Sequence, residues 1–369
     1  MAVDGLELRS TISAEGQLRV ALEPIAIDAP GPDEVIVRIE AAPINPSDLA
    51  LLLGPVDIAS LRSEGGALTG AILPARLASV QARMGQALPV GNEGAGTVIE
   101  AGVNVQDLLG KKVGMIGGAM YATHRKIAAR DCIPLPDHAT AADGASMFVN
   151  PLTALAFVET FRNEGHKAMV HTAAASNLGQ MLNRICIADG VPLINVVRSE
   201  AQAQILRDLG AKYILDSNAP DFREQLTELV AETGATLAFD AIGGGAMANT
   251  ILHAMETAEA RKLTAYNRYG SFTHKQVYIY GMLDTGVTTL DRGYGFSWSV
   301  SGFLLTPFLM KAGMETIGRL RARVATELTT TFASHYSQTI SLADVLKPEV
   351  AAEYNKKATG EKFLIDPSL

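Results

Sequence analysis

From residue 150 onward, short apolar segments alternate with longer segments of helical periodicity, and this alternation limits the fold more than any other feature. Roughly 10 to 15 residues of helical character separate the apolar segments, a spacing typical of β-α-β units. Gly210 and Gly234 end two of the helical segments, because glycine readily adopts the left-handed conformation that terminates a helix. The pattern predicts an α/β domain with a doubly wound parallel sheet. The apolar segments are AMVHT, PLINVV, YILD, TLAFD and QVYIYGML.

The first 150 residues have a different pattern, with short strands between glycine and proline turns. EVIVRIEAAPI, EGAGTVIEAG and KKVGMIGG are examples, and they indicate a small barrel-like β domain. Residues 54–88 form a long insertion whose structure the pattern does not define, and residues 257–275 form a polar excursion. After residue 303, a long amphipathic helix and the ending GEKFLIDP indicate a return to the first domain.

Composition narrows the possible partners and location. The 369 residues carry 31 Lys and Arg against 39 Asp and Glu, and the net charge of −8 argues against nucleic acid and anionic membranes as partners. The chain lacks an apolar run of roughly 18 residues and a signal peptide at its start, so we expect a cytoplasmic protein. Its two cysteines, Cys132 and Cys186, provide neither a disulfide framework nor a cysteine-rich zinc lobe.

The segment VHTAAASNLGQML, residues 170–182, leads from a predicted strand into a predicted helix. Ala174, Ser176 and Gly179 occupy the three spaced positions of the nucleotide-binding pattern G-x-G-x-x-G. Backbone N–H groups and the helix dipole hold a pyrophosphate at such a turn, so small residues are sufficient. Small residues also let any helix pack closely on a strand, and the turn alone therefore does not decide the function.

Six ordered motifs resemble the medium-chain dehydrogenase/reductase superfamily, in its zinc-free quinone oxidoreductase and enoyl reductase-like branch. They are AAPINPSDL, GNEGAGTVIEAG, NPLTA, AAASNLG, FDAIGG and VYIYG. The resemblance implies a GroES-like β-barrel catalytic domain at residues 1–149 and 303–369, and a Rossmann domain at residues 150–302. It also implies a homodimer, with SWSVSGFLL as an edge strand paired between two copies.

The expected cofactor residues lie after the predicted strands, where open α/β sheets bind ligands. Arg198 ends the second strand, where an acidic residue would bind a ribose hydroxyl of NAD, so its charge favours the 2′-phosphate of NADPH. A solvated residue at a strand end is the alternative for Arg198, and Glu200 weakens the assignment. The cofactor-binding residues that we expect are Asn150, Thr153, Ala174, Ser176, Asn177, Leu178, Gly179, Arg198, Ser199, Ala241, Ile242, Gly243, Tyr280, Gly281, Met282 and Leu283.

We expect no metal. The resemblance implies that zinc-dependent members place Cys and His where this chain has Asn45 and Asn92, and asparagine is a poor zinc ligand. The histidines are scattered along the chain. Asn45, Asn92 and Asn150 are candidate amide donors to a substrate oxygen, although asparagine is also common in turns and helix caps. Asn45 and Asn150 are the better candidates because they lie inside matched motifs.

The need for a proton donor distinguishes enoyl reduction from quinone reduction. The resemblance implies a tyrosine in the loop after NPSD for enoyl reduction, but the first tyrosine of this chain is Tyr121. Tyr121, Tyr266 and Tyr269 remain candidates, and we place Tyr121 with Asn45 and Asn92 as catalytic residues. A hydroquinone oxygen takes its proton from water, so we expect an NADPH-dependent quinone reductase acting on a small electrophile such as a quinone or enone. The alternatives are an enoyl or 2-alkenal reductase, and a nucleotide-binding protein without significant turnover.

Overall fold

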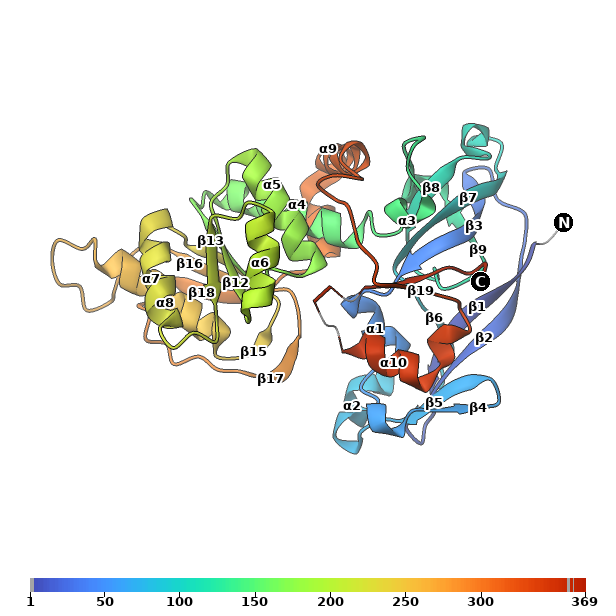
Figure 1. The fold of residues 1–369 in the computed structure, drawn as a ribbon, viewed down its shortest axis with the longest axis horizontal. Coiled ribbons are helices and arrows are strands. Elements are labelled where there is room, and N and C mark those ends of the chain that lie inside the picture. The colour runs from blue at the N-terminus through green and yellow to red at the C-terminus, as the bar shows by residue number, and fades with distance from the viewer. Residues whose placement is uncertain (1–2, 357–358, 361) are drawn as a thin grey trace. The chain divides into compact units, whose positions relative to one another are not determined.

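The computed structural model describes residues 3–356, 359–360 and 362–369 (Figure 1). The chain forms two compact units. The first combines Met1–Val149 with Arg321–Leu369, and the second is the continuous stretch Asn150–Leu320. The second unit extends beyond residue 302, where we expected it to end. Arg319 lies in this additional part, and its guanidinium group pairs with the Glu159 carboxylate of the same unit at 2.7 Å.

The first unit is built mainly from two sheets, with orders β4-β5-β2-β1-β6 and β10-β8-β7-β3-β20-β19, and β9 also pairs with β3. The strands of the first sheet are β1 Val3–Ile12, β2 Gln17–Ile27, β4 Arg62–Glu64, β5 Ala67–Ala71 and β6 Leu88–Pro89. Those of the second are β3 Glu34–Pro43, β7 Glu93–Ala101, β8 Lys112–Ile116, β9 His124–Ala128, β10 Cys132–Pro134, β19 Gln338–Ile340 and β20 Phe363–Ile365. The α-helices are α1 Pro46–Leu52, α2 Leu77–Val80, α3 Ala141–Gly144 and α10 Pro348–Asn355.

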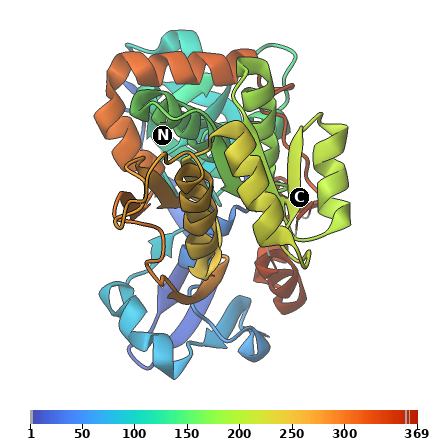
Figure 2. The same cartoon turned by 90° about the vertical axis from the view of Figure 1, so that its left-hand side faces the viewer.

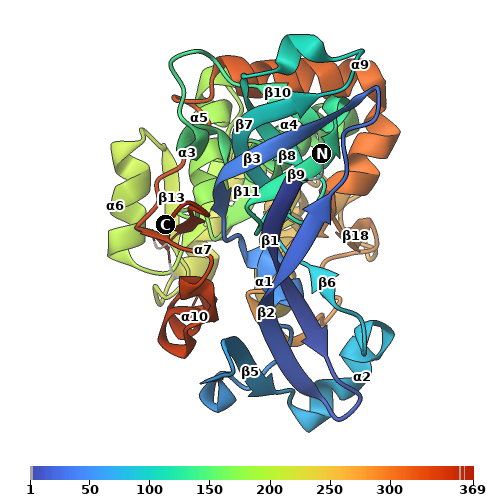
Figure 3. The same ribbon diagram turned by 90° about the vertical axis from the view of Figure 1, so that its right-hand side faces the viewer.

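The long hairpin of β1 and β2 shows why these residues form strands (Figure 3). Leu18 and Val20 are fully buried while Arg19 between them is exposed, the alternation of a strand with one face on the core. Gly16 closes the hairpin with a φ of 78°, a left-handed conformation that favours glycine. The apolar face of this hairpin forms part of the core of the first unit.

The insertion at residues 54–88 extends the β1–β2 hairpin on both sides. β5 pairs with β2, and β6 pairs with β1. Arg83, at the end of the 3-10 turn Gln81–Arg83, donates to the Ser10 hydroxyl at 2.8 Å and to the Ala50 carbonyl at 3.2 Å. The insertion is therefore attached to the sheet and to α1.

The second unit contains a six-stranded parallel sheet of order β13-β12-β11-β14-β16-β18, which confirms the predicted fold class. Its strands are β11 Met169–Thr172, β12 Leu193–Val197, β13 Tyr213–Asp216, β14 Leu237–Asp240, β16 Lys275–Ile279 and β18 Trp298–Gly302. Its helices include α4 Val149–Glu164, α5 Asn177–Asp189, α6 Glu200–Asp208, α7 Phe222–Thr233 and α8 Met247–Ala260. Gly234 ends α7 with a φ of 72°, as the sequence predicts.

Helices cover both faces of this sheet. α7 and α8 lie side by side and pack their apolar residues on one face (Figure 2). On the opposite face, the Phe157 ring of α4 stacks on the Phe239 ring of β14, with a centroid distance of 3.9 Å. Because both faces of the sheet are covered, its strands have near-continuous apolar sequences, as the sequence pattern shows.

Two further features were not expected. The helix predicted after residue 303 is α9 (Leu305–Thr326), and Gly313 divides it with a non-helical φ of 82°. A small parallel pair, β15 (Gly243–Gly245) and β17 (Asp284–Thr288), connects the loops that follow β14 and β16. None of the described helices has the length and apolar character needed to cross a bilayer.

Candidate functional site

The strand order of the second unit marks where a ligand is expected. The order reverses between β11 and β14, and open α/β sheets bind ligands at the carboxyl ends of the strands beside such a switch point. The expected cofactor residues 174–179, 198–199, 241–243 and 280–283 follow β11, β12, β14 and β16. The topology therefore brings these four segments to one edge of the sheet.

The turn that leads from β11 into the start of α5 contains a single glycine, Gly179. Ala173 has a φ of 52°, so an alanine takes the left-handed position that glycine usually occupies. A Cβ atom at Gly179 would lie 2.2 Å from the Ala174 carbonyl oxygen, so this position accepts only glycine. The helix thus approaches the strand closely, as a phosphate-binding turn requires.

Ser176 is the N-cap residue of α5. Its hydroxyl oxygen accepts the Gly179 N–H at 3.2 Å, which leaves the hydroxyl hydrogen free to donate to a ligand. Asn177 and Leu178 form the first turn of the helix, where N–H groups lack intrahelical partners and carry partial positive charge. Together these residues form a geometry that suits a phosphate group.

Arg198 is exposed at the end of β12. Its backbone is held in place, because its N–H donates to the Gln202 side chain at 3.1 Å and its carbonyl accepts from Asn218 at 2.7 Å. The carboxylate of Glu200 instead binds both guanidinium nitrogens of Arg207, at 2.7 and 2.8 Å. Glu200 is therefore engaged elsewhere on its own helix.

The loops after β14 and β16 are bonded to each other. The Tyr280 N–H donates to the Asp240 carbonyl at 2.9 Å, and the Leu283 N–H donates to the Ala241 carbonyl at 3.2 Å. Asp240 also accepts the Thr172 hydroxyl at 2.6 Å, which connects the ends of β11 and β14. We did not predict a role for Asp240, although the acidic residue just before the glycines of FDAIGG was a usable signal.

His171, which is fully buried, and Tyr280, which is half-buried, form a pair on the α4 side of this edge. The His171 Nε2 atom and the Tyr280 hydroxyl are 2.8 Å apart, and both rings lie beside Phe157. Burial lowers the pKa of His171 to about 3, and burial raises the pKa of Tyr280 far above its usual value. Thr153 of α4, one turn before Phe157, is buried, and Asn150 at the start of α4 is half-buried.

The first unit holds a second group of polar residues around Asn45, which is buried. The Asn45 amide nitrogen donates to Glu93 Oε1 at 2.8 Å, and the amide oxygen has no partner among the described residues. Glu93 Oε2 accepts the backbone N–H groups of Phe148 and Val149, each at 2.9 Å. One of the two N–H groups of the Asn45 amide is thus directed at Glu93.

Asn92 lies beside this group. Its N–H donates to Asp48 at 2.9 Å, and its side-chain nitrogen donates to the Ser47 hydroxyl at 3.1 Å. Burial is the largest cause that raises the pKa of Asp48, to about 7, and burial lowers the pKa of Lys362 to about 8. Lys362 donates to Ser146 at 2.7 Å. We did not single out Asp48, Glu93 or Lys362, although NPSD, GNEG and GEKF carried them.

Tyr121 is not placed as a proton donor. The side chain is fully buried, and its hydroxyl donates to the Pro43 carbonyl oxygen at 3.0 Å. Burial and the nearby Asp48 carboxylate raise the pKa of Tyr121 well above its usual value. Tyr266 and Tyr269 precede β16, and so they lie at the amino end of that strand rather than at the ligand-binding edge.

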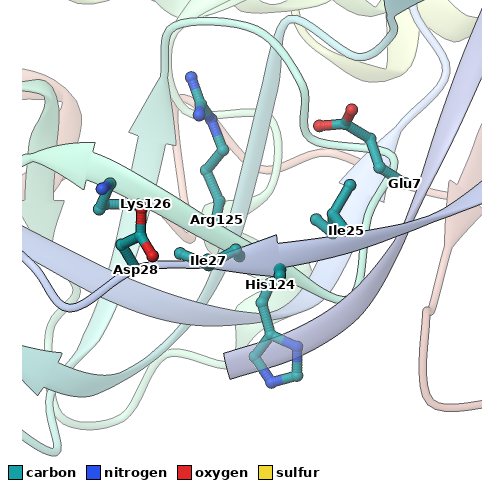
Figure 4. Close-up of a pocket in the computed structure, with 8 residues that line it drawn as sticks. Glu7, Ile25, Ile27, Asp28, His124, Arg125 and Lys126 are labelled. Atoms are coloured by element: carbon teal, nitrogen blue, oxygen red, sulfur yellow. The ribbon is translucent and has the colours of Figure 1, made fainter. Parts of the chain in front are cut away.

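A pocket of about 230 Å³ lies on the first unit (Figure 4). It has both acidic and basic side chains, and His124 and Arg125 point to opposite sides of β9 in Figure 4. None of the expected site residues lines it. The described residues also contain no group of three or more His, Cys, Asp or Glu that could hold a metal ion. The pocket is lined by Glu7, Ile25, Ala26, Ile27, Asp28, His124, Arg125 and Lys126.

Comparisons with known proteins agree with this architecture. Residues 178–260 match the family model described as zinc-binding dehydrogenase. A mitochondrial enoyl-[acyl-carrier-protein] reductase of Xenopus tropicalis is 30% identical over 202 residues, which are 53% of this chain and 51% of that reductase. The match thus spans about half the length of this relative.

Solved structures match over nearly the whole chain. A proposed NADPH:quinone reductase of Mesorhizobium loti is 27% identical with a TM-score of 0.73, covering 99% of this chain and 98% of that one. Escherichia coli quinone oxidoreductase complexed with NADPH is 18% identical with a TM-score of 0.69, covering 99% and 100%, and this shows the fold alone. This chain thus shares with these structures the combination of a β-rich unit and a doubly wound parallel sheet. These matches support the medium-chain dehydrogenase/reductase superfamily, and quinone reductases and enoyl reductases are among the similar proteins.

Proposed function

We propose that this chain is an NADPH-dependent oxidoreductase that transfers a hydride to a quinone or a similar conjugated carbonyl compound without zinc. The observation that carries the proposal is the switch-point edge of the second unit. There the single-glycine turn, Arg198 and the two bonded loops follow the carboxyl ends of four strands. The relatives named above include reductases of quinones and of enoyl groups, which supports the reaction class.

The residues at this edge fit NADPH in three ways. The turn from Ala173 to Gly179 offers N–H groups and the Ser176 hydroxyl to the pyrophosphate. Arg198 and Ser199 are our candidates for binding the 2′-phosphate, and the Glu200 carboxylate that would oppose it is paired with Arg207. We assign the loops at 241–243 and 280–283, together with Asn150 and Thr153, to bind the nicotinamide end of NADPH.

The chemistry requires little from the protein beyond binding and orientation. NADPH, when bound, supplies the hydride. Asn45 and Asn92 are amides, which bind zinc poorly, so alcohol activation by a metal is not part of the proposal. The Tyr121 hydroxyl already donates its hydrogen bond to the Pro43 carbonyl oxygen, so we assign no side chain as the proton donor. A quinone needs no such donor, because solvent can protonate the oxygen of the reduced product.

The test is NADPH oxidation measured with small ortho- and para-quinones, 2-alkenals and a trans-2-enoyl thioester, before and after dialysis against a strong chelator. We expect the quinones to react fastest, at a rate that dialysis does not change. Turnover of the thioester alone would establish the second candidate, an enoyl reductase, which the Xenopus relative favours. Nucleotide binding without turnover of any of these compounds would show that the chain is a nucleotide-binding protein and not an enzyme for them. Activity that is lost on dialysis and restored by zinc would refute the zinc-free mechanism.

We also propose a homodimer. β18 is the last strand on one side of the sheet, so within the described chain its outer edge is open for pairing. Phe296, before this strand, is 83% exposed, and Leu304 and Met310, after it, are 66% and 80% exposed. Antiparallel pairing of two β18 edges about a twofold axis would bring Phe296 of one copy toward Leu304 of the other.

A further inference from the structure

Asp240 is a fully buried carboxylate at the switch point. It accepts the Thr172 hydroxyl at 2.6 Å, the Ile242 N–H at 3.0 Å and the Gly243 N–H at 3.2 Å. An ionised carboxylate only accepts hydrogen bonds, so three donors match the charged form. The short bond from Thr172 has the length of a charge-assisted O–H···O⁻ bond.

The partners of this carboxylate carry no charge of their own. They are one hydroxyl group and two backbone amides. His171, next to Thr172, is neutral at physiological pH because burial lowers its pKa to about 3. Tyr280 responds to the same carboxylate, since its pKa is raised first by burial and then by the charge of Asp240. No cation is therefore among the hydrogen-bond partners that the structure gives for this carboxylate.

The charge lies directly under the loops assigned to the nicotinamide end. The Ile242 and Gly243 N–H groups that reach Asp240 belong to the first of these loops. This loop touches the second one, because a Cβ atom at Gly243 would lie 2.7 Å from the Gly281 carbonyl oxygen. Thr172 fixes the position of the carboxylate, since its hydroxyl also accepts the Ala241 N–H at 2.8 Å.

We propose that Asp240 supplies a fixed negative charge that favours the oxidised, positively charged nicotinamide over the reduced, neutral ring, and that Thr172 is the positioning residue that holds this charge. The inference rests on the proposed function. A fixed charge in a site with little water stabilises an opposite charge that develops nearby, and it needs no rearrangement during the reaction. Asp240 would thus assist the loss of a hydride from the cofactor without touching the ring.

The test compares the affinities of the two cofactor forms, NADP⁺ and NADPH, by titration of the protein without substrate. Both forms carry the same phosphates, so the ratio of their dissociation constants reports the charge of the ring. In Asp240→Asn we expect NADP⁺ to weaken about tenfold relative to NADPH, the size expected for a nearby charge in a partly buried site. Thr172→Val removes the hydrogen bond that positions the carboxylate, so we expect it to shift the ratio in the same direction as Asp240→Asn but by less, and Thr172→Ser should restore the ratio of the unmodified protein.

Asp291→Asn is the matched control, because it removes an exposed carboxylate of the same unit, and it should leave the ratio unchanged. Circular dichroism and thermal unfolding check that each variant folds. A ratio in Asp240→Asn equal to that of the unmodified protein would overturn the inference alone. If Asp240→Asn does not fold, Thr172→Val decides, and a ratio in that variant equal to that of the unmodified protein would overturn the inference. Failure of the unmodified protein to bind either nucleotide would overturn the proposed function together with this inference.

Discussion

Arg198 offers the most direct test at the scale of a single residue. Its side chain is exposed beyond β12, while the neighbouring Glu200 is paired with Arg207. A charge-assisted hydrogen bond to phosphate contributes roughly 1.5–3 kcal/mol, or about one to two decades of affinity. Arg198→Ala should therefore weaken NADPH by that amount and leave NADH unchanged in a fluorescence titration.

Arg261→Ala is the control for this prediction, because Arg261 is an exposed arginine of the same unit that pairs with Glu228. It should leave both affinities unchanged. Equal affinities for NADPH and NADH in the unmodified protein would contradict the assignment of Arg198.

His171 makes the stability of the protein depend on pH. Its pKa is lowered from 6.5 to about 3 by burial, so between these values the unfolded chain binds a proton that the folded chain does not. Stability therefore falls as the pH decreases from 6.5 toward 3, by up to about 1.4 kcal/mol per pH unit from this group. His171→Phe should show a smaller decrease in urea unfolding measured across this range. Tyr280→Phe, which keeps the histidine buried, should retain the slope, and identical slopes in His171→Phe and the unmodified protein would contradict the prediction.

Local spacing explains which site residues could be predicted from the sequence. Ala174, Ser176 and Gly179 lie within one strand–turn–helix segment, so their positions follow from neighbouring residues. The orientation of Asn45 depends on Glu93, which lies 48 residues away, and no local pattern contains that contact. The burial of Tyr121 and its bond to Pro43 likewise arise only in the folded sheet, so no local pattern shows them.

At the scale of elements, a buried ion pair attaches the polar excursion to the sheet. Lys275, at the start of β16, is fully buried and donates to Glu256 at 2.6 Å, to Ser271 at 2.9 Å and to the Thr273 carbonyl at 2.9 Å. Lys275→Met should reduce the free energy of unfolding by about 3–5 kcal/mol, because it leaves the Glu256 carboxylate without its cation. Urea unfolding measures the loss.

Two further variants complete this test. Lys275→Met combined with Glu256→Leu should recover part of the stability, since no buried charge is then left alone. Lys262→Met is the control, because Lys262 is 54% exposed in its pair with Glu259, and it should cost less than about 1 kcal/mol. A loss in Lys275→Met as small as in Lys262→Met would show that the pair does not anchor the excursion.

Elements with a strong apolar pattern were predicted well, and those held by distant contacts were not. β11, β12 and β14 are mostly apolar and are buried along their whole length, and such runs identify strands of an enclosed parallel sheet. The excursion has no such pattern, because an ion pair and hydrogen bonds hold it in place. The break at Gly313 was also missed, since a single glycine within a helical pattern does not by itself show that the helix ends.

At the scale of the whole molecule, the proposed homodimer depends on the outer edge of β18. Ser297 and Phe303 bond to the β16 side, through the Ser297 carbonyl at 3.0 Å and the Phe303 N–H at 2.8 Å. Alternate residues of a parallel strand face the same neighbour, so the Val300 N–H faces the open edge. Val300→Pro should therefore remove the pairing between copies and leave the sheet intact.

Light scattering measures this outcome. The unmodified protein should have twice the 39.0 kDa mass of one chain. Val300→Pro should have the mass of a single chain and should still bind NADPH. Val300→Thr, which retains the N–H group, should stay dimeric. A monomeric unmodified protein, or a dimeric Val300→Pro, would refute pairing through this edge.

The interrupted first unit has a consequence for how the protein is made. β3 pairs with β20 through Pro43 with Leu364 and Ala42 with Ile365, so β3 can complete this pairing only after residues 363–365 have been made. The stretch Asn150–Leu320 is continuous and can fold on the ribosome before that partner emerges. During this interval the edge of β3 lacks its β20 partner, and an open strand edge is a template for aggregation. Slower release of the nascent chain, or a chaperone that covers strand edges, should raise the yield of folded protein more than a ligand of the second unit does.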